Sequence, residues 1–214
     1  MTALPSRTLR QRGAFRIFRF AGINVFLHWS WFLIAIYEVQ VMKGRYHTPV
    51  WAVLEYLGLF AIVTMHEFGH ALACRQTGGY ADRIVLWPLG GVAFVQPPPR
   101  PGAYLWSIAA GPLVNVLLFP FFTAALFIAG RMDLQLTHPD FYTYLHALWA
   151  IDTLLLVFNL SPIYLLDGGQ LLRGLLWLSV GPIRSLKSAS CVGSIGAIAF
   201  AGVAYWRGLR WFAV

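Results

Sequence analysis

Charged side chains are scarce in this chain. Only 11% of its 214 residues are Asp, Glu, Lys or Arg, whereas a soluble globular domain carries about 25%. Hydrophobic residues make up 58%, so too few polar groups remain to cover a surface that faces water. The composition therefore excludes an ordinary soluble domain and predicts that lipid surrounds the protein.

Cysteine is also scarce, and repeats and low-complexity stretches are missing. The only two cysteines, Cys74 and Cys191, both lie inside apolar stretches. This placement argues against a disulfide framework and against a thiolate metal cluster. We predict a single integral-membrane domain over residues 1–214, with no segment long or polar enough for an added soluble domain.

Long apolar stretches are what the sequence does contain. A helix that crosses a bilayer needs about 20 mostly apolar residues. Five stretches meet this length, and they cover about residues 23–42, 52–77, 103–129, 142–177 and 188–207. The predicted fold class is an all-α polytopic membrane protein whose fourth segment is broken near Pro162, because proline interrupts helical hydrogen bonding. A strand-like pattern with a turn at its centre predicts a short β-hairpin at 82–96.

The basic residues give a formal net charge of +8, but they lie between the apolar stretches and not in one cluster. This distribution does not favour nucleic acid as a partner. The positive-inside rule explains it better, because a cytoplasmic N-terminus places eleven Lys and Arg residues on that side and five on the other. We predict a multi-pass protein of the cell or inner membrane, with a basic cytoplasmic N-terminus at 1–22.

A metal-binding pattern, HEFGH, occupies residues 66–70 in the second apolar stretch. Residues four apart on an α-helix project from nearly the same face, so His66 and His70 can bind one ion. Glu67 projects from beside them and is suited to act on a water molecule. Ionisable residues in the middle of a membrane segment are costly and must find partners or become neutral, and they usually mark functional sites. We therefore interpret this group as a metal site.

A third ligand must come from elsewhere, because catalytic zinc sites usually have three protein ligands. Asp167 is an acid in an otherwise apolar run, and Gly168 and Gly169 beside it permit close approach. Its predicted depth in the membrane is similar to that of His66. Cys74, one turn after His70, is a possible fourth ligand, but we favour a buried apolar role for it.

Four stretches, in matching order, resemble the site-2 protease family of intramembrane zinc metalloproteases. They are GINVFLHWSW at 22–31, HEFGHALA at 66–73, AAGPLVN at 109–115 and NLSPIYLLDGG at 159–169. The second and fourth correspond to the family motifs HExxH and NxxPxxxLDG. The resemblance implies one zinc ion held by His66, His70 and Asp167, with Glu67 as the catalytic acid and base. The chain looks like a minimal core without the PDZ-like insert or CBS domains of some relatives.

Three polar residues near these motifs have alternative interpretations. Asn159 is either a catalytic residue that donates a hydrogen bond to the scissile carbonyl, or a partner for backbone groups freed by Pro162; the resemblance favours catalysis. Asp152 either contacts the cavity or lies near the outer interface. Asn115 is interpreted mainly as a packing residue that bonds across helices.

The sequence therefore predicts an intramembrane zinc metalloendopeptidase. It would hydrolyse a peptide bond in or near a transmembrane segment of a single-pass protein, with Glu67 activating the zinc-bound water. The alternative is a membrane zinc transporter or scaffold without hydrolysis. A third reading is an inactive relative that acts as a chaperone for membrane helices. Ligands at one depth and an intact Glu67 favour the peptidase.

Overall fold

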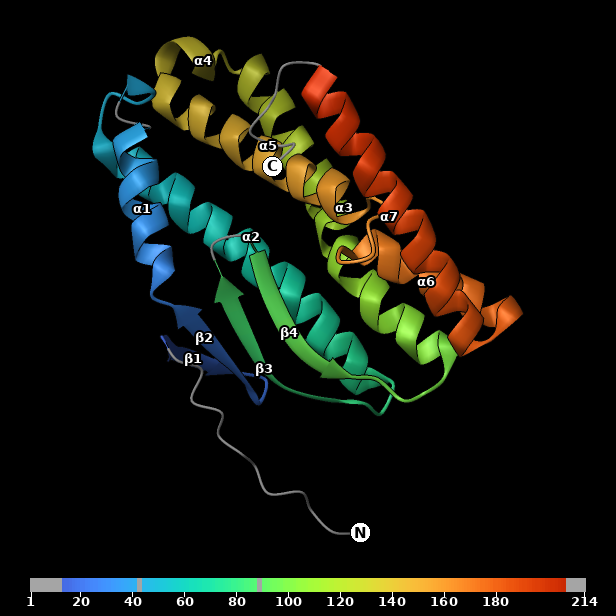
Figure 1. The fold of residues 1–214 in the computed structure, drawn as a ribbon. Helices are drawn as coiled ribbons and strands as arrows, with labels where there is room; N and C mark the ends of the chain where they lie inside the picture. Colours follow the sequence, from blue (N-terminus) through green and yellow to red (C-terminus); the bar gives the residue numbers. More distant parts are fainter. Residues whose placement is uncertain (1–12, 42–43, 88–89, 207–214) are drawn as a thin grey trace.

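Helices make up most of the fold, and a small sheet covers one side of it (Figure 1). The computed structural model describes residues 13–41, 44–87 and 90–206. In chain order the elements are β1 (Ala14–Phe20), β2 (Ile23–His28), α1 (Ser30–Val41), α2 (Pro49–Gln76), β3 (Tyr80–Trp87), β4 (Gly90–Gln96), α3 (Pro101–Arg131), α4 (Leu134–Thr137), α5 (Pro139–Asn159), α6 (Asp167–Val180) and α7 (Pro182–Trp206).

Among the described residues, α2, α3 and α5 are long and apolar enough to cross a membrane. Each begins at a proline, Pro49, Pro101 or Pro139. Proline suits the first turn of a helix, because its missing N–H would have no intrahelical partner there and its fixed φ is already helical. These three helices agree with an integral membrane protein, whereas the predicted number of five crossings is not confirmed.

The four strands form one sheet in the order β1-β2-β3-β4. Strands β2 and β3 are parallel and are joined through α1 and α2, while the β1–β2 and β3–β4 pairs are antiparallel. The predicted hairpin at 82–96 is confirmed as β3 and β4, but it belongs to a larger sheet. The expected all-α class is thus corrected to a helical fold with a four-stranded sheet.

The first predicted crossing, 23–42, is also corrected. Its first part is β2, whose residues alternate between buried and half-buried, and only the 12 residues of α1 are helical. Twelve helical residues extend about 18 Å, which is shorter than the roughly 30 Å hydrocarbon core of a bilayer. Residues 1–12 of the predicted cytoplasmic N-terminus lie outside the described part of the chain.

The fourth predicted segment, 142–177, is broken as expected. Helix α5 ends at Asn159, an irregular turn containing Pro162 follows, and α6 starts at Asp167. Proline disfavours the helical conformation in the residue before it, which explains why α5 cannot continue. The break places the first residue of α6 inside the protein, beside α2.

Helix α2 is the centre of the structure (Figure 1). One side packs on the sheet, where Ile23, Ile84 and Leu86 meet Val63 and Ala71 in the main apolar core. Another side packs closely on α3. A Cβ atom on Gly69 would lie 2.4 Å from the backbone oxygen of Ala110, so only glycine permits this approach. Helix α2 is therefore held firmly on two sides, which fixes the side chains it presents to the site.

Candidate metal centre

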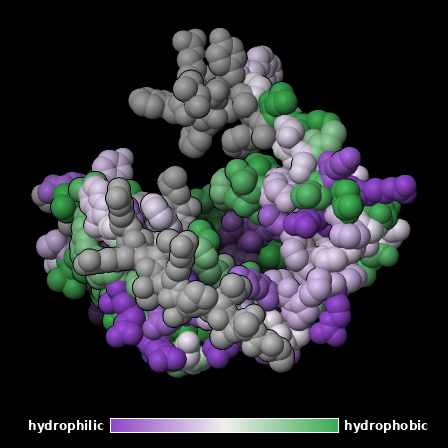
Figure 2. Space-filling view, turned by 60° about the horizontal axis from the view of Figure 1, so that its bottom comes forward, coloured by the Kyte–Doolittle hydropathy of each residue, from purple (hydrophilic) through white to green (hydrophobic). Residues whose placement is uncertain are grey.

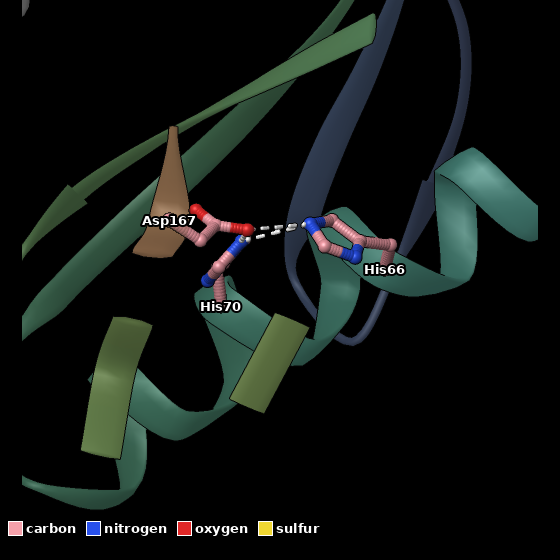
Figure 3. Close-up of side chains that lie close together, drawn as sticks. All are labelled: His66, His70 and Asp167. Carbon is pink, nitrogen blue, oxygen red and sulfur yellow. Dashed lines mark hydrogen bonds and ion pairs between the residues drawn. The ribbon is translucent and has the colours of Figure 1, made fainter. Parts of the chain in front are cut away.

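Helix α2 brings His66, Glu67 and His70 together, and all three side chains are buried. The two imidazoles point toward the same spot beside the helix, as the four-residue spacing predicts (Figure 3). Their ring centroids are 4.8 Å apart and the ring planes are nearly perpendicular. Both Nε2 atoms face that spot, 3.1 Å from each other.

Asp167 comes to the same spot from α6 (Figure 3). It is the first residue of that helix, where the positive end of the helix dipole favours a carboxylate. The two glycines after it allow the preceding turn to fold under α6. A Cβ on Gly168 would lie 2.2 Å from the backbone oxygen of Leu160, and one on Gly169 would lie 2.3 Å from that of Ile163. The DGG sequence thus places a carboxylate against α2.

The three ligand atoms form a small triangle. Asp167 Oδ2 lies 3.0 Å from His66 Nε2 and 3.3 Å from His70 Nε2. Ligand atoms of a tetrahedral zinc site, with bonds of about 2.0–2.1 Å, lie about 3.3–3.4 Å from one another. Among the described residues this is the one group of three or more His, Cys, Asp or Glu that fits an ion. A zinc ion therefore fits with only a slight opening of the triangle.

Hydrogen bonds at the far side of each ring fix which nitrogen carries the proton. His70 Nδ1 lies 2.9 Å from the backbone oxygen of Ser107, which can only accept, so Nδ1 is the donor. His66 Nδ1 lies 2.6 Å from the side-chain oxygen of Asn115 and donates likewise. Both Nε2 atoms then direct lone pairs at the Asp167 carboxylate. Three electron donors face one another at about 3 Å, an arrangement that a cation stabilises.

The orientation of Asn115 is itself fixed by Asp152. The Asn115 amide nitrogen donates to Asp152 Oδ1 at 2.7 Å, which leaves its oxygen for His66. Neither Asn115 nor Asp152 has any exposed surface. The bonding of Asn115 across helices that the sequence predicts is therefore present, and Asp152, for which the sequence allows two roles, is one of its partners. The structure joins Asp152, Asn115 and His66 in one buried chain of hydrogen bonds, which we call the relay.

Gly111 on α3 makes room for His70. A Cβ atom at this position would lie 2.2–2.8 Å from three atoms of the His70 ring. The GPLVN stretch thus serves the site twice, since Gly111 admits one imidazole and Asn115 orients the other.

Glu67 lies beside the triangle and is not part of it. Its Oε2 accepts a hydrogen bond from the backbone N–H of Ala93 on β4 at 2.8 Å. Gly91 allows this contact, because a Cβ there would lie 2.3–2.7 Å from three atoms of the Glu67 side chain. The carboxylate is therefore held between the ligand group and the sheet, where it can accept a proton near a bound ion.

A cavity of about 220 Å³ opens beside His66, Glu67 and Asp167, and Asn159 lies in its wall. Figure 2 shows a hollow on one face of the molecule, with hydrophilic residues in its depth and hydrophobic residues around it. Cys74 is elsewhere. It is fully buried in the apolar core, with its Sγ 3.5 Å from the backbone oxygen of Tyr80, and it is not in the ligand group.

A comparison with known protein families matches the part of the chain that contains the candidate metal centre. Residues 32–182 match the model of a family described as peptidase M50B-like. A zinc metalloprotease of Methanocaldococcus jannaschii is 32% identical over 180 residues, which cover 83% of this chain and 50% of that protein. Rip3 of Mycobacterium tuberculosis, provisionally named a zinc metalloprotease, is 31% identical over 87% of this chain and 50% of its own length. The chain spans half the length of both relatives.

A solved structure is similar over almost the whole chain. The site-2 protease from M. jannaschii matches with a TM-score of 0.63 and 27% identity, covering 94% of this chain and 88% of that one. The resemblance inferred from the four sequence stretches is thereby confirmed. The names of these relatives, together with the His66, His70 and Asp167 group, indicate zinc as the metal.

Proposed function

The chain belongs to the peptidase M50B-like family, and from this we propose that it is a zinc metalloendopeptidase acting on membrane-anchored proteins. It hydrolyses a peptide bond in or near a transmembrane segment of its substrate. The observation that carries the proposal is the position of Glu67. This buried acid lies beside three metal-ligating side chains without joining them, and it lines the cavity next to them.

Each residue of the site has a distinct role in the proposed reaction. His66, His70 and Asp167 hold one zinc ion per chain. When bound, zinc supplies Lewis acidity, which polarises a carbonyl group and makes water more acidic. Glu67 accepts the proton of the attacking water and delivers it to the leaving amine. The hydrogen bond from the Ala93 N–H keeps the carboxylate pointed at the cavity while it does so.

The sheet offers a place for the substrate. Strand β4 is the last strand of the order β1-β2-β3-β4, so within the described part of the chain one of its edges has no neighbouring strand. In a strand, both backbone polar groups of a residue point to the same side, and alternate residues point to opposite sides. The Ala93 N–H bonds to Glu67 and not to β3, so the backbone N–H and C=O of Ala93 point to the free edge. The backbone groups of Gly91 and Val95, two residues away on either side, point the same way.

A substrate segment added along this edge would pass Glu67 and the metal ligands. Strand addition requires that the segment be extended, which also frees the carbonyl groups that a transmembrane helix uses in its own hydrogen bonds. Asn159 in the cavity wall then donates a hydrogen bond to the scissile carbonyl oxygen. The expected partners are single-pass membrane proteins within the bilayer, and the N-terminus is proposed to face the cytoplasm.

The alternative of a zinc transporter or scaffold has less support. A transport path needs ligands at several depths, whereas the described residues hold one group of three or more metal-ligating side chains. A scaffold that only binds zinc does not require Glu67, an acid that is held beside the ligands without joining them.

Cleavage of a single-pass reporter in lipid vesicles tests the proposal. The purified protein should cut the reporter, lose this activity when a chelator removes zinc, and regain it when zinc returns. Bound zinc without chelator-sensitive cleavage of any transmembrane reporter would favour the scaffold instead.

A further inference from the structure

A second cavity, of about 350 Å³, continues from the metal centre along the free edge of β4. Like the first cavity it is lined by Glu67, Gly91 and Asp167, so the two cavities adjoin at the reaction centre. Ala93 and Val95 of β4 and Arg173 of α6 also line the second cavity. A chain added to β4 would therefore run from the metal ligands to a guanidinium group.

Arg173 is held in position by an aromatic ring and a hydroxyl group, without a counter-ion among the described residues. Its guanidinium lies over the ring of Tyr104, 5.1 Å from the ring centroid, and Nη1 donates to the Tyr104 hydroxyl at 3.5 Å. Tyr104 is fixed in turn by its hydrogen bond to the side-chain oxygen of Gln170. Within the described part of the chain, no carboxylate lies within 4.0 Å of Arg173, and its Nε is buried with no hydrogen-bond partner.

A partly buried cation without an anion is unfavourable, because it has lost hydration and gained no ion pair. An anion that enters the second cavity would supply the missing ion pair and so offset the lost hydration of Arg173. The cavity shares its walls with Glu67 and Asp167, so its occupant is the molecule that reaches the metal, namely the peptide substrate.

We infer that Arg173 binds an acidic side chain of the substrate and so selects the position of the cut. Arg173 lies six residues beyond Asp167 on α6, about 9 Å along the helix. An extended chain covers about 3.3 Å per residue, so a substrate strand that runs alongside α6 covers this distance in about three residues. We therefore place the acidic residue about three positions from the scissile bond, toward the Val95 end of β4. This inference rests on the proposed peptidase function.

A reporter series tests it. The parent is a single-pass reporter in lipid vesicles, with neutral residues at the four positions on each side of the scissile bond. Single aspartates are then introduced at each position, and kcat/KM is measured for each reporter. Aspartate about three residues from the cut, on one side only, should raise kcat/KM about tenfold over the neutral parent.

The Arg173→Glu variant should reverse the preference, cutting the reporter with lysine at that position faster than the one with aspartate. Arg131 is a matched control, because its guanidinium also lies over an aromatic ring, that of Phe127. This pair is at the end of α3, whereas Tyr104 is near its start. Arg131→Glu should keep the wild-type preference. Should Arg173→Glu fail to bind zinc, Arg173→Gln replaces it and should lose the preference for aspartate.

The outcomes separate the two proposals. If the wild-type protein cuts the neutral reporter in a zinc-dependent way and aspartate has no effect at any position, the inference about Arg173 is wrong and the peptidase function stands. A change at Arg173 that slows every reporter by the same factor also overturns the inference about Arg173. Its role would then be structural, through its contact with Tyr104. If no reporter is cut, both proposals fail.

Discussion

The side-chain oxygen of Asn115 lies 2.6 Å from His66 Nδ1 and accepts its hydrogen bond. This contact fixes the proton on the ring nitrogen away from the ligand group and leaves the other nitrogen free for a metal ion. Asn115 can do so only in one of its two amide orientations, and Asp152 selects that orientation by accepting from the amide nitrogen at 2.7 Å.

The relay therefore predicts how exchanging the side chains of Asn115 and Asp152 affects zinc binding. Asp152→Asn replaces a group that can only accept with an amide that can also donate, so Asn115 is no longer held in one orientation. Asn115→Asp places two carboxylates against each other. Each single change should weaken zinc binding about 10–100-fold. The double variant Asn115→Asp with Asp152→Asn restores an acceptor for His66 and a donor for that acceptor, so it should recover most of the affinity.

Zinc affinity, measured by competition with a chelator, checks the relay. Thr153→Val is the control, because Thr153 follows Asp152 on α5 but its hydroxyl donates to the backbone oxygen of Trp149 and not to the relay. A double variant that binds zinc no better than the weaker single variant would show that the relay only fills space.

Glu67→Gln should keep zinc and lose cleavage. Glutamine has the same shape and can still accept from the Ala93 N–H, but it cannot take a proton from water. We expect the cleavage rate in vesicles to fall about 10²–10⁴-fold at an unchanged zinc content. Glu55→Gln is the control, since Glu55 is the other buried acid of α2 and contacts Arg45 and Tyr46 instead of the site. Wild-type cleavage by Glu67→Gln would exclude the proposed mechanism.

Gly111→Ala should disrupt the metal centre. The added methyl group would overlap the His70 ring, which must move away from the ligand group. Zinc content should drop sharply, and cleavage with it. Gly130→Ala on the same helix meets no atom within 4 Å and should retain zinc. Full zinc content in Gly111→Ala would mean that α3 can shift without cost, contrary to the close packing described above.

Gly91→Ala should separate catalysis from metal binding. Its methyl group would push the Glu67 side chain away from the Ala93 N–H, while His66, His70 and Asp167 are not among its nearest neighbours. We expect normal zinc content with a large loss of cleavage. Gly102→Ala, which meets no atom within 4 Å, should be unaffected in both respects. Loss of zinc in Gly91→Ala would contradict the separate roles given to Glu67 and the ligands.

The grouping of the candidate metal ligands could be predicted from the sequence because most of its spacing is local. His66, Glu67 and His70 lie within five residues on one helix, and Asp167 stands out as an acid between an apolar run and two glycines. The helix break was predictable for a similar reason, since Pro162 acts on its immediate neighbours.

The sheet and the relay were harder to predict. Residues 23–28 form a short apolar run, and such a run has no periodicity that separates a buried strand from the start of a membrane helix. The relay joins residues on three helices, and Asn115 and Asp152 are 37 positions apart. Whether their side chains meet depends on how the helices rotate against one another, which the spacing along the chain does not encode.

The zinc content of the Asp167→Asn variant decides whether α6 supplies a metal ligand to α2, because Asp167 is the carboxylate that α6 places beside His66 and His70. The wild-type protein should purify with one zinc ion per chain, and Asp167→Asn should lose it. The control is Asp140→Asn, which removes an acid paired with His47 at the start of α5 and should keep the metal. Undiminished zinc in Asp167→Asn would contradict the account, because the two histidines would then bind the metal without the carboxylate.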